Sequence, residues 1–138
     1  MSDDSVRPGL VLETEQEVTP DLTAPHLGSG TLRVYATPAM SMLIEDTCRR
    51  LVDPLLAEGE TTVGVAMELR HLAPTPVGGK VHLRVEVSVV EGNIITFQAR
   101  LWDDVEPIGE AEHKRAVIQV ERFLARVQAK TARAEGKA

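Results

Sequence analysis

The chain contains few aromatic residues: two Phe, one Tyr and one Trp make up 3% of its 138 residues. Its core must therefore be aliphatic, and a hydrophobic content of 43% is typical of a globular protein. The length suits a single domain over residues 1–138, because a chain of this size builds one core. The only cysteine, Cys48, has no partner for an internal disulfide, which favours a reducing, intracellular environment.

Long apolar runs and a positive net charge are also missing. No run approaches the roughly 20 residues of a membrane span, and the acidic start MSDDSV lacks the charge pattern of a signal peptide. We therefore expect a cytoplasmic protein without a membrane partner. The net charge of -6 argues against nucleic acid as a partner, because neutralising phosphates requires a basic surface.

Motifs for metals and phosphates are absent as well. The sequence has no Gly-rich phosphate loop and no G-x-S-x-G elbow. The four histidines show no ligand spacing, so we expect neither a metal nor a bound cofactor; they are His26, His71, His82 and His113. His82 alternates with valines and is predicted to face solvent. His71 ends a strand before a Pro-rich turn, where a histidine is most often structural.

One long helix is predicted from Pro38 to Leu56. A spacing of 3.6 residues places its apolar side chains on one broad face, formed by Met40, Leu43, Ile44, Thr47, Cys48, Leu51 and Leu55. The preceding segment, Pro20–Gly30, is rich in Pro, Gly and Ser, which predicts a structureless loop long enough to be a lid. The N-terminus, about 1–8, is expected to be flexible, and the charged, helix-prone tail, about 126–138, is expected to fray.

A period of two residues predicts strands elsewhere. The clearest is Val81–Val89, where apolar side chains alternate with polar ones. The other strands are predicted at Leu10–Val18, Thr61–Leu69, Ile94–Trp102 and Ile108–Val120. A lone helix with a wide apolar face must be wrapped by the sheet that follows it. This order predicts an α+β hot-dog fold, an antiparallel sheet of about five strands around one long central helix. Exposed sheet edges make a homodimer the expected assembly.

Two features of the helix allow structural explanations. Thr37-Pro38 suits a helix start, because Thr is a good N-cap and Pro fits the first helical position. Glu45 and Arg49 stand four residues apart, as do Asp46 and Arg50, so both acids are candidates for solvated helix pairs. Glu45 nevertheless falls at the boundary of the apolar face, where a carboxylate can face a crevice.

Four stretches together resemble the fluoroacetyl-CoA thioesterase family of the hot-dog superfamily. They are ATPAMSMLIE, with Thr37 eight residues before Glu45; EGETTVG, ending at Gly64; RHLAPTP, around His71; and EHKRAVIQVERFLARV, near the end. The resemblance runs without gaps from Val34 to Val127, about two-thirds of the chain. It implies an acyl-CoA substrate and thioester hydrolysis.

The resemblance also implies roles for individual residues. Thr37, Glu45 and His71 match the family's catalytic Thr, Glu and His. Gly64 matches a glycine whose backbone N–H contacts the thioester, and Arg115 matches an arginine near the acyl pocket. Such chemistry needs a nucleophile or positioned water, a base and donors for the oxyanion, which a helix start with free N–H groups can supply. The choice between Thr37 and Glu45 as nucleophile stays open.

The family's phenylalanine gate is missing: the corresponding stretch, Gly28-Ser29-Gly30-Thr31, has no aromatic residue. We therefore expect hydrolysis of ordinary short acyl-CoAs without strong fluoroacetyl preference, in an aliphatic pocket around Met40 and Met42 that adapts by repacking. The main alternative is a non-catalytic acyl-CoA-binding hot-dog domain. A hot-dog hydratase fits less well, because its usual Asp…His pair in one loop is missing.

Overall fold

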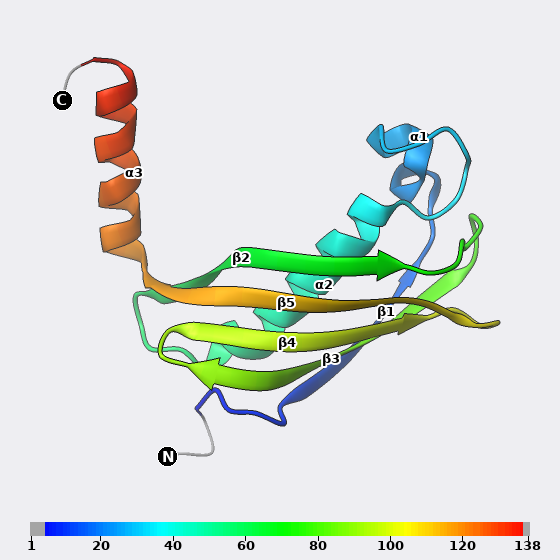
Figure 1. Cartoon of the computed structure of the whole chain (residues 1–138), viewed down its shortest axis with the longest axis horizontal. Coiled ribbons are helices and arrows are strands. Elements are labelled where there is room, and N and C mark those ends of the chain that lie inside the picture. The colour runs from blue at the N-terminus through cyan, green and yellow to red at the C-terminus, as the bar shows by residue number, and fades with distance from the viewer. Residues whose placement is uncertain (1–4, 137–138) are drawn as a thin grey trace.

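The computed structural model describes residues 5–136, in which a five-stranded antiparallel sheet curves around one long helix (Figure 1). The elements in chain order are β1 (Val11–Glu17), η2 (Pro20–Leu22), α1 (Ala24–Leu27), α2 (Thr37–Val52), η3 (Asp53–Leu55), β2 (Glu60–His71), β3 (Lys80–Glu91), β4 (Ile94–Trp102), β5 (Pro107–Gln119) and α3 (Val120–Ala134). The predicted α+β arrangement is confirmed. Residues 1–4, half of the N-terminal segment predicted to be flexible, lie outside the described part.

The strands lie in the order β1-β3-β4-β5-β2, and every neighbouring pair is antiparallel. Alternation gives the sheet a dry inner face, because successive side chains point to opposite sides. Val85, Ala99 and Ala111 are paired across β3, β4 and β5, and each is at most 8% exposed. The outer face carries the polar partners, such as Arg84, which is paired with Arg100.

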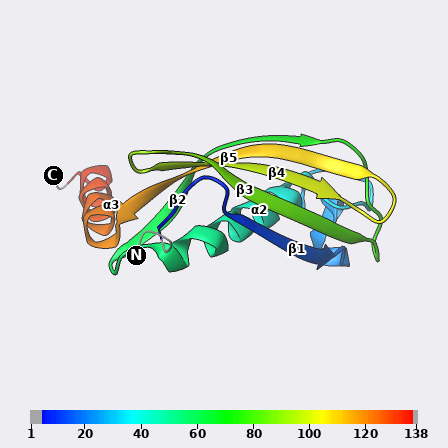
Figure 2. The same cartoon turned by 90° about the horizontal axis from the view of Figure 1, so that it is seen from below.

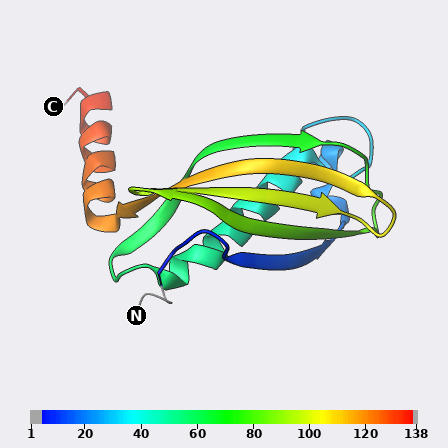
Figure 3. The same ribbon diagram turned by 60° about the horizontal axis from the view of Figure 1, so that its bottom comes forward.

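Helix α2 lies against this inner face and supplies much of the core (Figures 2 and 3). Its buried residues are Ala39, Met40, Leu43, Ile44, Thr47, Cys48 and Val52. The predicted apolar face is therefore largely correct. The few aromatic residues are used selectively: Tyr35 and Phe97 are fully buried, and the Tyr35 hydroxyl donates to Gln16 Oε1 at 2.6 Å.

Three details differ from the sequence-based expectation. Helix α2 ends at Val52 and not at Leu56, because Pro54 has no N–H to donate to the carbonyl four residues earlier; a short 3-10 turn follows. Residues 20–30 are not structureless, since two short helical turns, η2 and α1, lie there. Val89 is 42% exposed because a bulge between Val87 and Val89 shifts the register of β3 with β4.

Two exposed features lie on one side of the domain: the edge strand β2 and the helix α3. Strand β2 is a sheet edge, paired only with β5 among the described strands. Helix α3 follows β5 directly and stands across the strand direction, reaching past the β2 edge in Figure 1. It contains no buried residue, and the helix-prone tail predicted from the sequence is helical as far as Ala134. Whether this tail frays stays a prediction.

Candidate functional site

The first half of the candidate site is a contact between Thr37 and His71, which we call the Thr37–His71 pair. Thr37 is the first residue of α2 and His71 is the last residue of β2, so the fold places helix start and strand end together. Thr37 Oγ1 and His71 Nδ1 lie 2.8 Å apart, within hydrogen-bond distance. The predicted N-cap role of Thr37 is wrong: Ala36 is the N-cap, and no side chain caps this helix.

The His71 ring is set up to stay neutral. Its Nε2 atom is buried and has no hydrogen-bond partner among the described residues, while Tyr35 meets the ring edge-on at a centroid distance of 6.4 Å. Burial lowers the pKa of His71, and the Ala73 backbone partly opposes this shift. A neutral imidazole beside a hydroxyl is the arrangement that general-base catalysis requires.

The second half of the candidate site is a cleft of about 300 Å³ at the β2 edge, which we call the Glu45 cleft. It is lined by Met42, Glu45, Asp46, Arg49, Gly64 and Arg115. A Cβ placed on Gly64 would lie 2.8 Å from Glu45 Oε2, so the carboxylate covers the glycine backbone closely. A helix pair does not explain Glu45, because Arg49 bonds Asp46 at 2.7 Å instead, and Asp46 also meets Arg50 at 3.1 Å.

Arg115 forms the floor of this cleft and is only 6% exposed. Its Nε donates to Thr62 Oγ1 at 2.8 Å, and one terminal nitrogen donates to the Thr62 carbonyl at 3.0 Å. Thr62 in turn donates to Asp53 Oδ1 at 2.7 Å. Burial lowers the pKa of Arg115, whereas Asp53 and Glu45 raise it, so the guanidinium remains charged beneath the cleft.

His113 completes this network, a role that the sequence did not predict. It is 1% exposed; its Nδ1 lies 2.8 Å from the Ala66 carbonyl, and its Nε2 lies 3.2 Å from an Arg115 terminal nitrogen. A carbonyl only accepts and a guanidinium only donates, so His113 must carry its proton on Nδ1 and accept at Nε2. Burial lowers the pKa of His113, with a further contribution from Arg115. The sequence signal for this pair is spacing: residues 113 and 115 are two apart in β5, so their side chains lie on the same face of the strand.

The Ala66 carbonyl is available because β2 bulges at this point. The register with β5 shifts between Gly64 and Ala66, which leaves Val65 out of the ladder and 54% exposed. His113 therefore ties the bulge to Arg115. The bulge, the glycine and the arginine form one rigid floor below the Glu45 carboxylate.

Within one chain, the two halves of the site stay apart. Thr37 and Glu45 are eight residues apart on α2, a rise of about 12 Å at 1.5 Å per residue. The two methionines predicted to line one acyl pocket, Met40 and Met42, lie in different environments. Met42 is 62% exposed in the Glu45 cleft, whereas Met40 is fully buried, and a Cβ on Gly109 would lie 2.8 Å from its sulfur. Met40 therefore packs the core and does not line this cleft.

Two further observations concern the helices and the single cysteine. In residues 5–136, no helix is both long and apolar enough to cross a lipid bilayer. Cys48 is fully buried, and burial raises the pKa of its thiol to about 12, so the thiol stays protonated near neutral pH.

Comparison with known proteins identifies the fold and the family. The family model described as fluoroacetyl-CoA-specific thioesterase matches residues 18–121. A fluoroacetyl-CoA thioesterase from Streptantibioticus cattleyicolor is 40% identical over 98 residues, which cover 71% of this chain and 70% of that protein. A solved fluoroacetyl-CoA thioesterase structure matches with a TM-score of 0.86 at 34% identity, over 91% of this chain and 98% of that one.

More distant structures agree. A thioesterase superfamily member from Thermus thermophilus matches with a TM-score of 0.87 at 26% identity, over 95% of this chain and 97% of that one. A hot-dog-like protein from Thermanaerovibrio acidaminovorans, 23% identical with a TM-score of 0.86 over 94% of this chain and 95% of that one, shares the fold. The predicted hot-dog fold is thereby confirmed, and the chain belongs to the fluoroacetyl-CoA-specific thioesterase family.

Proposed function

We propose that this protein hydrolyses short-chain acyl-CoA thioesters, converting acyl-CoA and water to a free acid and CoA. The observation that carries the proposal is the Thr37–His71 pair, a hydroxyl hydrogen-bonded to a neutral imidazole in a member of a thioesterase family. The buried cysteine and the CoA substrate both fit a cytoplasmic location.

The pair supplies the proton chemistry of the reaction. His71 Nδ1 takes a proton from the Thr37 hydroxyl, or from a water held between them, as the nucleophile attacks the thioester carbonyl. The carbonyl oxygen then becomes an oxyanion, which backbone N–H groups at Gly64 and at the start of α2 stabilise. The carbon–sulfur bond breaks as the oxyanion collapses, and a proton passes to the thiolate of CoA. Where water is the nucleophile, this step releases the free acid. Where Thr37 or Glu45 is the nucleophile, an acyl ester or anhydride remains, and a water that His71 deprotonates attacks its carbonyl, releases the acid and restores the side chain. Whether Thr37 or Glu45 attacks is decided by trapping: an acyl group on one of them after a rapid quench identifies the nucleophile.

We further propose that a homodimer completes the site. Strand β2 presents an unpaired edge with exposed apolar residues beside it, namely Met42, Val65 and Leu72, which are 54% to 62% exposed. A two-fold axis near the middle of β2 pairs the two edges antiparallel and sets the two α2 helices side by side in opposite directions. Each Thr37–His71 pair then faces the Glu45 cleft of the other subunit. The two halves of the site meet in this way, although within one chain eight helical residues hold them about 12 Å apart.

Complementation tests this arrangement directly. Thr37→Ala and Glu45→Gln each inactivate both sites of a homodimer. When the two variants are unfolded and refolded together, half of the dimers are mixed, and each mixed dimer keeps one intact site. We expect about a quarter of the wild-type kcat, measured as thiol release from acetyl-, propionyl- or butyryl-CoA. No recovery would place the complete site within a single chain.

Two outcomes would replace the proposal. If a panel of acyl-CoAs binds without thiol release, the protein is a non-catalytic acyl-CoA-binding domain. If fluoroacetyl-CoA is preferred over acetyl-CoA by more than about a thousandfold in kcat/KM, another residue replaces the missing aromatic gate, because a small difference in group size is worth only about 1–3 kcal/mol. The exposed stretch Gly28–Thr31 supports broad acceptance of short chains.

A further inference from the structure

Helix α3 is the most basic element of an acidic protein. Its 15 residues contain four cations, Arg122, Arg126, Lys130 and Arg133, against one acid, Glu121, while the whole chain has a net charge of -6. None of the salt bridges among the described residues involves these four cations. Within residues 5–136, no salt bridge therefore compensates this charge.

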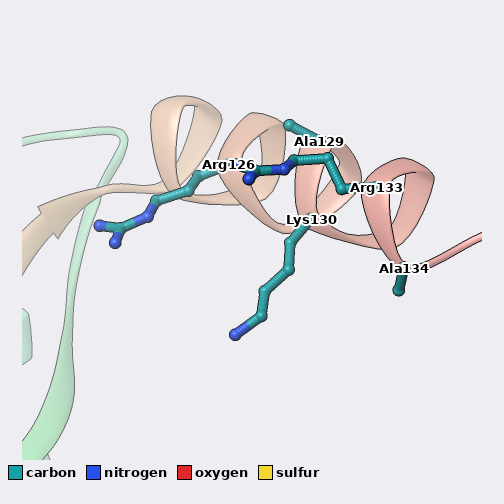
Figure 4. Close-up of a pocket in the computed structure, with 5 residues that line it drawn as sticks. All are labelled: Arg126, Ala129, Lys130, Arg133 and Ala134. Atoms are coloured by element: carbon teal, nitrogen blue, oxygen red, sulfur yellow. The ribbon is translucent and has the colours of Figure 1, made fainter. Parts of the chain in front are cut away.

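Three of the cations line one hollow. This hollow, of about 650 Å³, is open to solvent, and the residues that border it all belong to α3: Arg126, Ala129, Lys130, Arg133 and Ala134. Figure 4 shows the three cationic side chains leaving the same side of α3 and extending back toward the end of the sheet. They are spaced at i, i+4 and i+7, so they stand one above the other along the helix. The small side chains of Ala129 and Ala134 leave room between them.

Helix stability alone does not account for this cluster. Arg133 lies in the last turn, where a cation is favoured by the helix dipole. Arg126 lies in the middle of α3, where that benefit is lost. Like charges four residues apart repel and destabilise a helix. A bound polyanion removes that repulsion, so the cluster is better explained by a ligand than by the fold of the helix.

The hollow lies within reach of the Glu45 cleft of the same chain. The Val120 N–H donates to the Gly59 carbonyl at 2.9 Å, so α3 begins beside the start of β2. From Gly59 to Gly64 is about 16 Å of strand. From Val120 to Arg126 is about 9 Å of helix. The hydrogen-bonded step from Gly59 to Val120 adds about 5 Å, so the straight-line distance from Gly64 to Arg126 is at most about 30 Å.

The shape of CoA matches this separation. Its pantetheine arm has about as many chain atoms as a five-residue peptide, which extends to roughly 17 Å. The diphosphate and the ribose 3′-phosphate lie beyond that arm. With its thioester at Gly64, CoA is therefore long enough for its phosphates to reach α3.

We propose that Arg126, Lys130 and Arg133 bind the diphosphate and 3′-phosphate of the CoA part of the substrate. This inference rests on the proposed function, and it assigns α3 as the nucleotide-end subsite of that same site. Guanidinium groups match phosphate oxygens with paired hydrogen bonds, and the lysine adds a point charge. Recognition of the acyl group stays with the Glu45 cleft, and recognition of CoA comes from α3.

The test removes charge from α3 and compares two substrates. For Arg126→Gln/Arg133→Gln, we expect KM for butyryl-CoA to rise about five- to tenfold with kcat unchanged, because exposed charge-assisted contacts are individually modest. Hydrolysis of S-butyryl-pantetheine, which has no phosphates, is expected to match wild type. Adenosine 3′,5′-bisphosphate should compete with butyryl-CoA in the wild type and lose potency in the variant.

A matched control removes the same charge elsewhere. Arg84→Gln/Arg100→Gln takes two cations from the outer face of the sheet and is expected to leave KM for butyryl-CoA within about twofold of wild type, since exposed ion pairs there contribute little. An equal rise of KM in both variants would mean that overall charge, not the α3 hollow, attracts the substrate.

The remaining outcomes overturn the subsite without touching the proposed function. The first is an unchanged KM in a protein that still hydrolyses butyryl-CoA. The second is a KM rise of equal size with S-butyryl-pantetheine, or a change of oligomeric state in the α3 variant by light scattering. The third is sedimentation of the wild type but not the variant with phosphatidylserine vesicles at unchanged KM, which would make α3 a membrane-surface helix. If neither substrate is hydrolysed by the wild type, the proposed function itself fails.

Discussion

Substituting Gly64 with alanine is expected to abolish most activity while leaving the fold intact. The added Cβ would lie 2.8 Å from Glu45 Oε2, whereas an ordinary contact begins at 3.4 Å. The carboxylate must therefore retreat by at least about 0.6 Å. Displacement of a positioned group by about an ångström costs on the order of 10²-fold in rate. We expect kcat/KM to fall by that factor.

Stability should change little, for two reasons. The obstructing atom is the end of a flexible side chain, so it moves without disturbing the backbone, and the next contacts, His113 and Arg115, lie at 3.4 Å and 3.6 Å. Alanine also restricts the unfolded chain, which offsets a small loss by about 0.4–1 kcal/mol. The free energy of unfolding, measured by urea denaturation, is expected to stay within about 1 kcal/mol of wild type.

Gly109→Ala is the contrasting control. There the Cβ would lie 2.8 Å from the Met40 sulfur and 3.2 Å from the Arg70 carbonyl, inside the core and against backbone. Overpacking of this kind costs about 1–3 kcal/mol, so this variant should lose stability first. At Gly64 the one atom that is too close ends a side chain that can move, whereas at Gly109 the methyl group would meet both a buried sulfur and a backbone carbonyl.

A double-mutant cycle identifies the route of the Gly64 effect. In a Glu45→Ala background the obstructed carboxylate is gone, so adding Gly64→Ala should cost little further activity. If the two losses multiply instead, the methyl group acts on the substrate or on the backbone N–H. A Gly64→Ala variant with wild-type kcat/KM would show that the position of Glu45 does not matter.

Four other outcomes are expected. The Asn side chain of His113→Asn keeps the donor for the Ala66 carbonyl but loses the contact with Arg115, whereas His113→Gln keeps an acceptor for Arg115. We therefore expect kcat/KM to be about tenfold lower in the Asn variant than in the Gln variant. Equal losses would contradict a positioning role for His113. Because burial lowers the pKa of His71, kcat/KM should rise with pH through a midpoint below about 6.5. Burial lowers the pKa of both His71 and His113 in the folded chain, so the unfolded chain binds more protons as the pH falls. The free energy of unfolding should therefore be highest above about pH 6.5 and should decline below it. Thermal unfolding measured between pH 5 and 8 will test this. Cys48 should resist iodoacetamide at pH 8 until denaturant is added.

The fold was predictable because two periodicities carry it. One apolar helix and five alternating segments leave few arrangements other than a sheet wrapped around the helix. The predictions that failed concern local backbone structure. The turns η2 and α1 have no apolar period of their own and depend on distant contacts, such as the bond from the Ala24 N–H to the Val34 carbonyl at 3.0 Å. The bulge at Val89 is hidden because Val89 and Val90 are both apolar.

The site was predictable only in part. Family resemblance selected Thr37 and His71, and they lie together. The N-cap assignment failed because a threonine hydroxyl has a choice of partners, and the tertiary one, His71, won over the local one. The roles of His113 and Thr62 depend on pairing between β2 and β5, whose residues are far apart in the sequence. No spacing rule for a single segment reveals such a network.

The same geometry explains why the helix of this fold serves catalysis without completing it. Helix α2 is straight and packed along the sheet, so its exposed side chains are fixed about 1.5 Å per residue apart along the axis. A hydroxyl at its first residue and a carboxylate two turns later are rigidly positioned but never adjacent. Flexibility in one chain cannot join them without unpacking the core. In the proposed homodimer, a second copy running in the opposite direction would bring them together with both helices intact and would cover the apolar side chains beside the β2 edge. The fixed separation along one helix is therefore the reason for proposing that the site is shared between two subunits of a symmetric dimer.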